Sequence, residues 1–265
     1  MHDTLTSLVE RAIAGHPRPL EFYLREHSGL PGPRANLELA NDVSYLLAAA
    51  ANKHPDTVHS LVNYFATGDR KQVLGNTPAE FIMLCGVIAA GTCAAVQAEW
   101  REKTIEMLSH YACSPYGRIR EGVATAYQHL LSVDQQLVIA SLKQLATEGN
   151  YLQQRAAVAA IAESHLLFDP AIVSDAVLLQ RVVLENSRRV PAAERKIEDF
   201  KILRRALGYT LSIITAAAPE QGFALMRECA SWNDDDITWI LRENLKKKRL
   251  AKFSQDAALI AQLLT

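Results

Sequence analysis

Lysines and arginines are concentrated in two short segments of the chain, each of which has a local excess of positive charge. Between Arg188 and Arg205, seven lysines or arginines accompany three acids, and between Arg242 and Lys252 six bases accompany one acid. A row of such side chains along one surface attracts phosphates and releases the counterions condensed on a nucleic acid. The candidate binding residues are the bases Arg188, Arg189, Arg195, Lys196, Lys246, Lys247, Lys248 and Arg249, together with the aromatic Trp239.

The chain as a whole carries no excess of positive charge. Its 28 lysines and arginines are balanced by 29 aspartates and glutamates, so the formal net charge is -1. A nucleic-acid partner would therefore have to be held by the two local segments. Lysines at the C-terminal end of a helix also complement the helix dipole, which is an alternative explanation for Lys246, Lys247 and Lys248.

Side chains that could form a catalytic or metal centre do not occur at the required spacings. The sequence contains no HExxH, P-loop, GxGxxG or GxSxG motif, and His54 and His59, five residues apart, do not share a helix face. Asp234, Asp235 and Asp236 form the densest acidic cluster, and we expect them to cap a helix rather than bind a cation. We therefore expect no catalytic residue, no metal and no cofactor.

Three features predict a cytoplasmic protein without a membrane partner. The four cysteines show no CxxC spacing, which is typical of a reducing compartment. Residues 81–98 carry no charge and approach the length of a membrane helix, but the interspersed glycines and the missing basic flank favour a buried core helix. The first residues lack the basic and apolar regions of a secretory signal.

Apolar residues recur at spacings of three and four along almost the whole chain, which predicts an all-α protein. In residues 134–149, leucines and valines form one stripe, with Asp134 as a candidate N-cap and Gly149 as a stop. Residues 151–167 are small or aliphatic on several faces, as in a helix that is packed between neighbours.

Helix pairs of this kind repeat. Arg120 aligns with Arg155 at a shift of 35 residues, a period typical of helical solenoids, and Arg204 and Arg242 follow at shifts of 49 and 38. We expect these four arginines to brace neighbouring repeats near the starts of the second helices. The excess length of the 49-residue step falls on residues 186–199, which we expect to form a surface loop or, alternatively, a loop that contacts a ligand.

The pattern resembles the HEAT-repeat family, whose second helices commonly carry an aliphatic–arginine pair after a turn aspartate. Here this pair is Leu241-Arg242, following Asp236. The resemblance covers residues 97–250 closely and residues 17–96 loosely. It implies an α-solenoid of stacked antiparallel helix pairs over residues 1–265 as one domain, including pairs at 18–28 with 33–51 and 55–66 with 78–96. A capping helix would occupy residues 254–265, with Ser254 as its N-cap.

One branch of this superfamily, the DNA alkylation repair glycosylases, is similar at NYLQQRAA (150–157) and RRALGYTL (204–211). Those enzymes cradle duplex DNA in a basic concave face with tryptophans beside a catalytic aspartate. The chain has Trp100, Trp232 and Trp239 but lacks the paired-tryptophan and aspartate motif, so the resemblance assigns no catalytic residue.

Two functions follow as expectations. The first is a non-enzymatic helical-repeat scaffold that binds a protein or peptide on its curved surface, because repeat scaffolds expose long faces and reactive groups are missing. The alternative is a DNA- or RNA-binding relative of the alkylation repair branch, which as an enzyme would be a DNA glycosylase. A chaperone role like that of phycobilin lyases, known for other HEAT-like proteins, is a third option. Basic segments that converge on one face around a tryptophan would favour nucleic acid.

Overall fold

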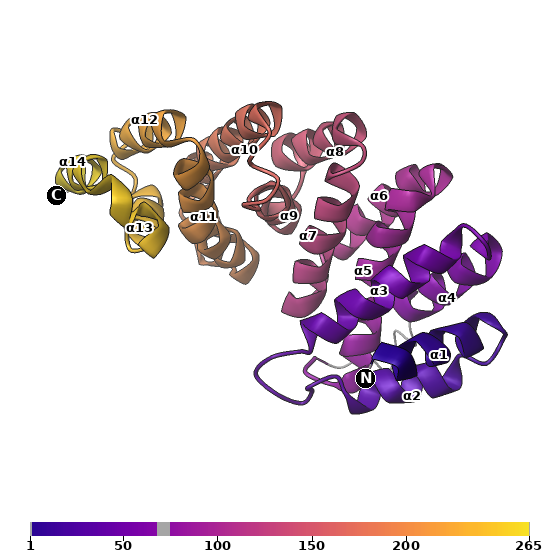
Figure 1. Cartoon of the computed structure of the whole chain (residues 1–265). Coiled ribbons are helices and arrows are strands. Elements are labelled where there is room, and N and C mark those ends of the chain that lie inside the picture. Colours follow the sequence, from indigo (N-terminus) through magenta and orange to yellow (C-terminus); the bar gives the residue numbers. More distant parts are fainter. Residues whose placement is uncertain (1, 68–74, 265) are drawn as a thin grey trace. The chain divides into compact units, whose positions relative to one another are not determined.

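The computed structural model describes residues 2–67 and 75–264, and all regular secondary structure in these ranges is helical. Fourteen α-helices and three 3-10 helices occur there without a strand, which confirms the all-α prediction (Figure 1). The helices cluster in two compact units, unit 1 over Met1–Asp134 and unit 2 over Gln135–Thr265.

Unit 1 is built around one long apolar helix, α5, which packs against α3 and α7 in a first layer. In a second layer, α4 packs mainly on α5, and α6 packs on α5 and α7. Helix α1 contacts α3 and α4, and α2 packs on α5 and α1. The helices of unit 1 are α1 (His2–Ile13), α2 (Arg18–Glu26), α3 (Leu37–Ala51), α4 (Pro55–Thr67), α5 (Pro78–Val96), α6 (Arg101–Tyr111) and α7 (Gly117–Leu131), with η1 (Ala98–Trp100) before α6.

Helix α5 is long and apolar, with Glu80 in its first turn, and it lies in the core of unit 1. Thr77 caps it by accepting a hydrogen bond from the Glu80 amide, and Pro78 occupies the first turn, where its missing N–H costs nothing. A Cβ atom at Gly86 would lie 2.1 Å from the Ala66 nitrogen, so glycine allows α4 to approach closely. The helix is long and apolar enough to cross a membrane, but 83% of that stretch is buried inside the protein.

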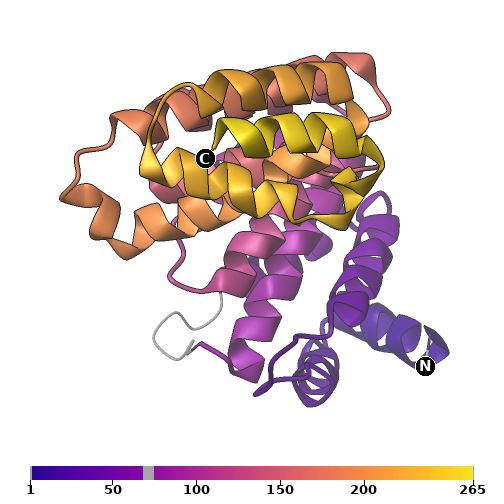
Figure 2. The same cartoon turned by 90° about the vertical axis from the view of Figure 1, so that its left-hand side faces the viewer.

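Unit 2 also has two layers, and consecutive helices alternate between them (Figure 2). Helices α9, α11 and α13 pack side by side in the first layer, while α8, α10, α12 and α14 follow one another in the second. Its helices are α8 (Gln135–Glu148), α9 (Tyr151–Ile161), α10 (Pro170–Arg189), α11 (Glu198–Ala217), α12 (Pro219–Ala230), α13 (Asp235–Leu245) and α14 (Ser254–Leu263), with η2 (Glu194–Lys196) and η3 (Lys248–Phe253).

Several predicted boundaries differ from the structure for local reasons. Ser254 is the first residue of α14 rather than its cap, because Phe253 holds the cap position without a side-chain bond. The loop predicted at residues 186–199 is shorter in the structure, because α10 continues to Arg189 and α11 begins at Glu198. Arg242 lies in the last turn of α13, not near its start. The stop at Gly149 is confirmed, directly after the end of α8.

Candidate functional site

The first turn of α13 organises the polar surface of unit 2. Asp234 is the N-cap, and its carboxylate accepts hydrogen bonds from the backbone N–H groups of Asp236 and Ile237 at 3.0 and 3.1 Å. Asp236, in the first turn, is only 9% exposed. Carboxylates at this end of a helix interact favourably with its dipole, so the capping role expected of this acidic cluster is confirmed.

Arg195 uses its whole guanidinium group to fasten the connection between α10 and α11 to α13. Its Nη1 lies 2.8 Å from Oδ2 of Asp234 and 3.1 Å from Oδ2 of Asp236. Its Nε and Nη2 donate to the carbonyl oxygens of Val190 and Arg188, at 2.9 and 2.7 Å. Burial lowers the pKa of Arg195, but the hydrogen bonds and charges of the two aspartates outweigh burial and raise it. This predicted binding residue therefore braces the fold.

The same connection is also tied to α9. The Tyr151 hydroxyl donates a hydrogen bond to Oε2 of Glu194 at 2.6 Å. Desolvation, followed by the hydrogen bond and charge of Glu194, raises the pKa of Tyr151 to about 12. Through Glu194 and Arg195, residues 190–197 are joined to the two helices that flank α11 in the first layer.

Two arginines lie over the two tryptophans of unit 2. Arg204 pairs with Asp236, and its Cζ lies 4.2 Å from the ring centroid of Trp239. The Cζ of Arg188 lies 5.3 Å from the ring centroid of Trp232. Such cation–π contacts stabilise both partners and occupy one face of each indole. We call Arg188, Arg195, Arg204, Trp232, Asp234, Asp236 and Trp239 the arginine–tryptophan cluster.

The second basic segment lies at the other end of α13. Lys246 follows the helix and pairs with Glu243, and this hydrogen bond lowers the pKa of Glu243. The 11 residues of α13 separate its two ends by about 16 Å at 1.5 Å per residue. The structure thus brings Trp239 together with Arg204 of the first basic segment, while Lys246 of the second segment, whose partner Glu243 lies one turn after Trp239, lies at the far end of α13.

Most arginines of the basic segments are bonded within the chain. Arg189 pairs with Glu185 at 3.8 Å, Arg205 pairs with Glu198, and Arg242 donates to the Leu264 carbonyl at 2.6 Å. The predicted binding residues that form no ion pair in the part of the chain the structure describes are Arg188, Lys196, Lys247, Lys248 and Arg249.

The four arginines at the aligned positions, Arg120, Arg155, Arg204 and Arg242, were expected to brace neighbouring repeats. Arg120 donates to the Ser114 carbonyl at 2.6 Å, Arg204 joins α11 to Asp236 of α13, and Arg242 holds the end of α14. Arg155 is buried in α9 with 5% exposure. The contact of Arg204 joins two neighbouring first-layer helices and supports the expected bracing role, and that of Arg242 joins α13 to the end of α14, whereas the contact of Arg120 stays within the connection that precedes its own helix.

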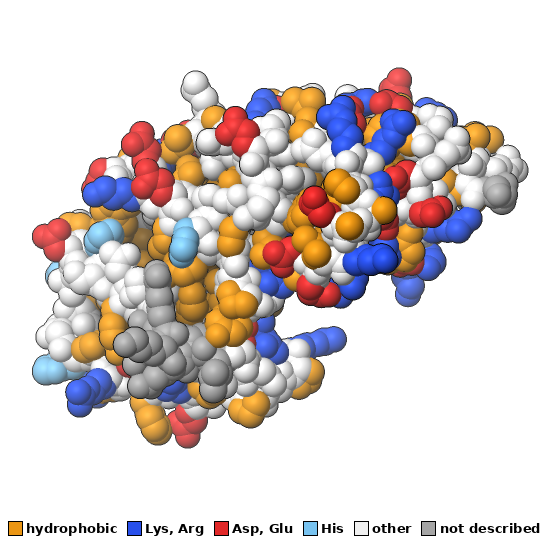
Figure 3. All heavy atoms as spheres, turned by 180° about the vertical axis from the view of Figure 1, so that it is seen from behind, with side chains coloured by type: hydrophobic (Ala, Val, Ile, Leu, Met, Phe, Trp, Pro, Cys, Tyr) orange, Lys and Arg blue, Asp and Glu red, His pale blue; other side chains and the backbone are white. Residues whose placement is uncertain are grey.

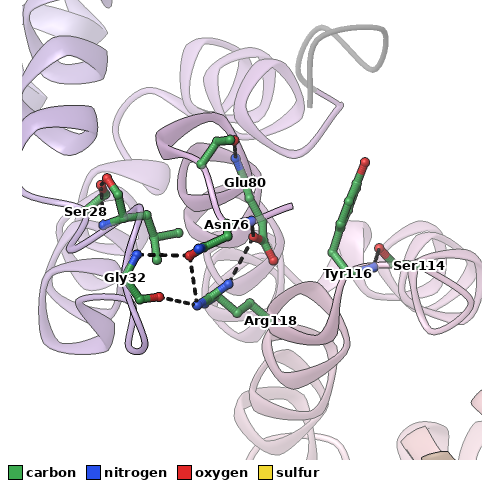
Figure 4. Close-up of polar contacts among 9 residues, drawn as sticks. Ser28, Gly32, Asn76, Glu80, Ser114, Tyr116 and Arg118 are labelled. Atoms are coloured by element: carbon green, nitrogen blue, oxygen red, sulfur yellow. Dashed lines mark hydrogen bonds and ion pairs between the residues drawn. The ribbon is translucent and has the colours of Figure 1, made fainter. Parts of the chain in front are cut away.

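Sequence reasoning missed a buried charge cluster in unit 1 (Figure 4). The Glu80 side chain is 2% exposed, and its Oε2 lies 3.2 Å from Nη1 of Arg118. The same oxygen accepts the Asn76 amide at 2.6 Å. Arg118 Nη2 also donates to the Gly32 carbonyl at 2.9 Å, and Asn76 Oδ1 accepts the Gly32 amide at 3.0 Å.

This cluster joins the loop before α3 to the starts of α5 and α7. Because the Glu80 carboxylate is occupied by a guanidinium and a backbone amide, its role is structural. The available signal was the sequence Thr77-Pro-Ala-Glu80, which has the spacing of a capping box. Its glutamate instead binds the amide of Asn76, one residue before the cap.

The residues placed in the two units do not form a recognisable metal centre. Across the described ranges, no group of three or more His, Cys, Asp or Glu side chains could hold a metal ion.

No known family model matches the chain, and no curated protein matches it.

Proposed function

We propose that the chain is a HEAT-like helical-repeat scaffold that binds a protein or peptide and performs no chemistry of its own. The alternation of consecutive helices between two layers in unit 2 supports this proposal, because stacked antiparallel helix pairs produce that arrangement. The free thiols of Cys85, Cys93, Cys113 and Cys229 are compatible with a reducing cytoplasm, where we place the protein.

The choice of a protein partner rests on the ion pairs that Arg195 and Arg204 form within the chain. Arg195 and Arg204 neutralise Asp234 and Asp236, so these two charges of the first basic segment are used within the chain, whereas Arg188, Lys196, Lys247, Lys248 and Arg249 form no ion pair among the described residues. The two tryptophans already carry an arginine on one face, which leaves less ring surface for stacking on bases. Both features favour a protein partner over nucleic acid.

The arginine–tryptophan cluster is the surface that we propose for this partner. Tryptophan and arginine are the residues most often found at the energetic centre of protein interfaces. Trp232 and Trp239 are half-buried, so their positions are defined while part of each ring stays accessible. Arg188 is exposed and forms no ion pair in the described ranges, so it adds an accessible positive charge.

A peptide library displayed on phage and selected on the full chain tests this proposal. We expect selected peptides to bind at least tenfold more weakly to the variants Arg188→Glu and Trp232→Ala, as expected for the loss of hot-spot residues. Lys53→Glu, which changes an exposed lysine of unit 1, is the charge-matched control and should bind normally. A selection that yields no binder, or binders insensitive to both changes, contradicts the proposal.

A nucleic-acid-binding function is the second candidate, and the unpaired bases of the C-terminal segment favour it. Lys247, Lys248 and Arg249 form no ion pair among the described residues, and all three follow α13 directly. If they contact phosphates, neutralising them should weaken binding about equally across sequences and reduce its salt dependence.

A further inference from the structure

In the second layer of unit 1, a gap lies between α4 and α6. In the second layer of unit 2, the successive helices α8, α10 and α12 pack against one another without such a gap. Within the described residues, the backbones of α4 and α6 lie farther apart than those of the corresponding helices of unit 2, although both pack on α5 and the Tyr111 hydroxyl of α6 donates a hydrogen bond to the Ala66 carbonyl of α4 at 2.9 Å. The gap forms an open groove of about 710 Å³. Small-molecule sites typically measure about 300–1,000 Å³. On the left-hand side of Figure 3, histidine side chains lie beside hydrophobic ones.

The groove is lined by one face of each flanking helix. Trp100, Lys103, Met107 and His110 line it from η1 and α6, at spacings of three and four residues. Such residues lie on a single side of a helix. His59 lies on the facing side of α4 and also lines the groove.

Aromatic and apolar groups form the floor and one wall. The ring centroids of His59 and Trp100 lie 5.0 Å apart with the planes tilted by 52°. Ala90 of α5 lies at the floor, and Met107, whose thioether packs well against rings, is half-buried. A planar ring entering the groove would therefore meet the indole and an apolar floor.

The ammonium group of Lys103 is available to a ligand. Lys103 is exposed and forms no ion pair in the ranges that the structure describes, whereas the nearby Arg101 is held by Asp134 at 3.0 Å. Glu99 is the one carboxylate among the described residues that line the groove, and its negative charge reduces the attraction of the lining for an anion. Among the described lining residues, Lys103 is the one lysine or arginine, so we expect the negative charge of a ligand to lie at its ammonium group.

We propose that this groove binds small aromatic anions, with the ring against Trp100 and His59 and the carboxylate, sulfonate or phosphate at Lys103. The site lies within unit 1 and does not depend on the protein-binding surface proposed for unit 2. It requires no reaction, since the groove only holds its ligand.

Three naphthalene probes that differ in charge test the proposal on the full chain. Calorimetry should show that naphthoate binds more tightly than naphthylmethanol, and that naphthylmethylammonium binds most weakly. Lys103→Gln should weaken naphthoate binding by about three- to fivefold, as expected for an exposed ion pair, and leave the neutral alcohol unchanged. Trp100→Leu should weaken all three probes, and Lys53→Gln should change none of them.

Fluorine NMR of fluorotryptophan-labelled protein locates the binding. The chain has three tryptophans, and only the Trp100 resonance, assigned from Trp100→Leu, should shift during the naphthoate titration. The inference is overturned if naphthoate binding does not saturate, if the three probes bind equally, or if the shifts fall on Trp232 and Trp239.

Discussion

The Arg204 guanidinium lies over the Trp239 ring at 4.2 Å and also pairs with Asp236, three residues before Trp239, so one side chain of α11 joins two side chains of α13. Gly208 lies one turn further along α11, and a Cβ there would be 3.2 Å from the Trp239 ring. The missing Cβ lets the indole pack between the helices. Arg204, which was expected to brace neighbouring repeats, thus contributes to the packing of α11 on α13.

Replacing Arg204 should therefore destabilise the fold. Arg204→Ala leaves Trp239 without its cation and Asp236 with only Arg195, and should lower the free energy of unfolding by about 1–2 kcal/mol. Urea unfolding followed by circular dichroism measures this change. Arg205→Ala is the matched control, because Arg205 and its partner Glu198 are both mostly exposed and should contribute little. Equal effects of the two substitutions would contradict the bracing role.

A second prediction concerns Asn244, which is fully buried in α13. Its Oδ1 accepts the Ser212 amide at 2.7 Å, and its Nδ2 donates to the Leu207 carbonyl at 2.8 Å, so the side chain inserts into the backbone of α11. Asn244→Leu would leave these groups unpaired and should lower the free energy of unfolding by about 2–4 kcal/mol. The Ser212 amide should then exchange its hydrogen faster, and unchanged protection would refute this explanation.

A third prediction concerns the charge cluster of unit 1. Glu80→Ala removes the buried partner of Arg118 and should lower the free energy of unfolding by about 2–3 kcal/mol, less than for a fully buried pair because Arg118 is partly exposed. Glu38→Ala, at an exposed position in the first turn of α3, serves as the control in the same urea titration. A loss no larger than that of the control would mean that the cluster does not hold the loop before α3.

Alkaline pH should loosen the connection between α10 and α11. The pKa of Tyr151 is raised to about 12 in the folded chain, compared with about 10 for an unperturbed tyrosine. Because the folded state favours the protonated hydroxyl, its contribution to stability is complete below about pH 10 and is lost as the pH rises towards about 12. Tyr151→Phe should flatten the pH dependence of unfolding in that window, whereas Tyr45→Phe should not.

The helices could be predicted from the sequence where the signals are local. The helix expected at 78–96 is α5, Pro78–Val96, because Pro78 and the Thr77 cap mark its start. The helix pair expected at residues 134–149 and 151–167 corresponds to α8 and α9, since Gly149 follows α8 and Asn150 caps α9, but α9 already ends at Ile161. These devices act within a few residues of one another, so they can be recognised in one sequence.

The surface chemistry could not be predicted in the same way. Counting bases treated Arg195 as a free charge, but its partner Asp236 is 41 residues away and meets it only because α11 packs beside α13. Trp100, Lys103 and Met107 have helical spacing, but whether a neighbouring helix covers them depends on the separation of α4 and α6. Both features depend on tertiary packing, which a single sequence does not encode in short patterns.

Fluorescence anisotropy can directly test whether the two basic segments bind a nucleic acid. Labelled duplex and single-stranded oligonucleotides would be titrated with the chain, and with Lys246→Ala/Lys247→Ala/Lys248→Ala, at low and at physiological salt. We expect no saturable binding at physiological salt and little difference between the two proteins. Saturable binding at physiological salt that is lost in the triple variant would contradict the protein-binding proposal and establish the nucleic-acid alternative.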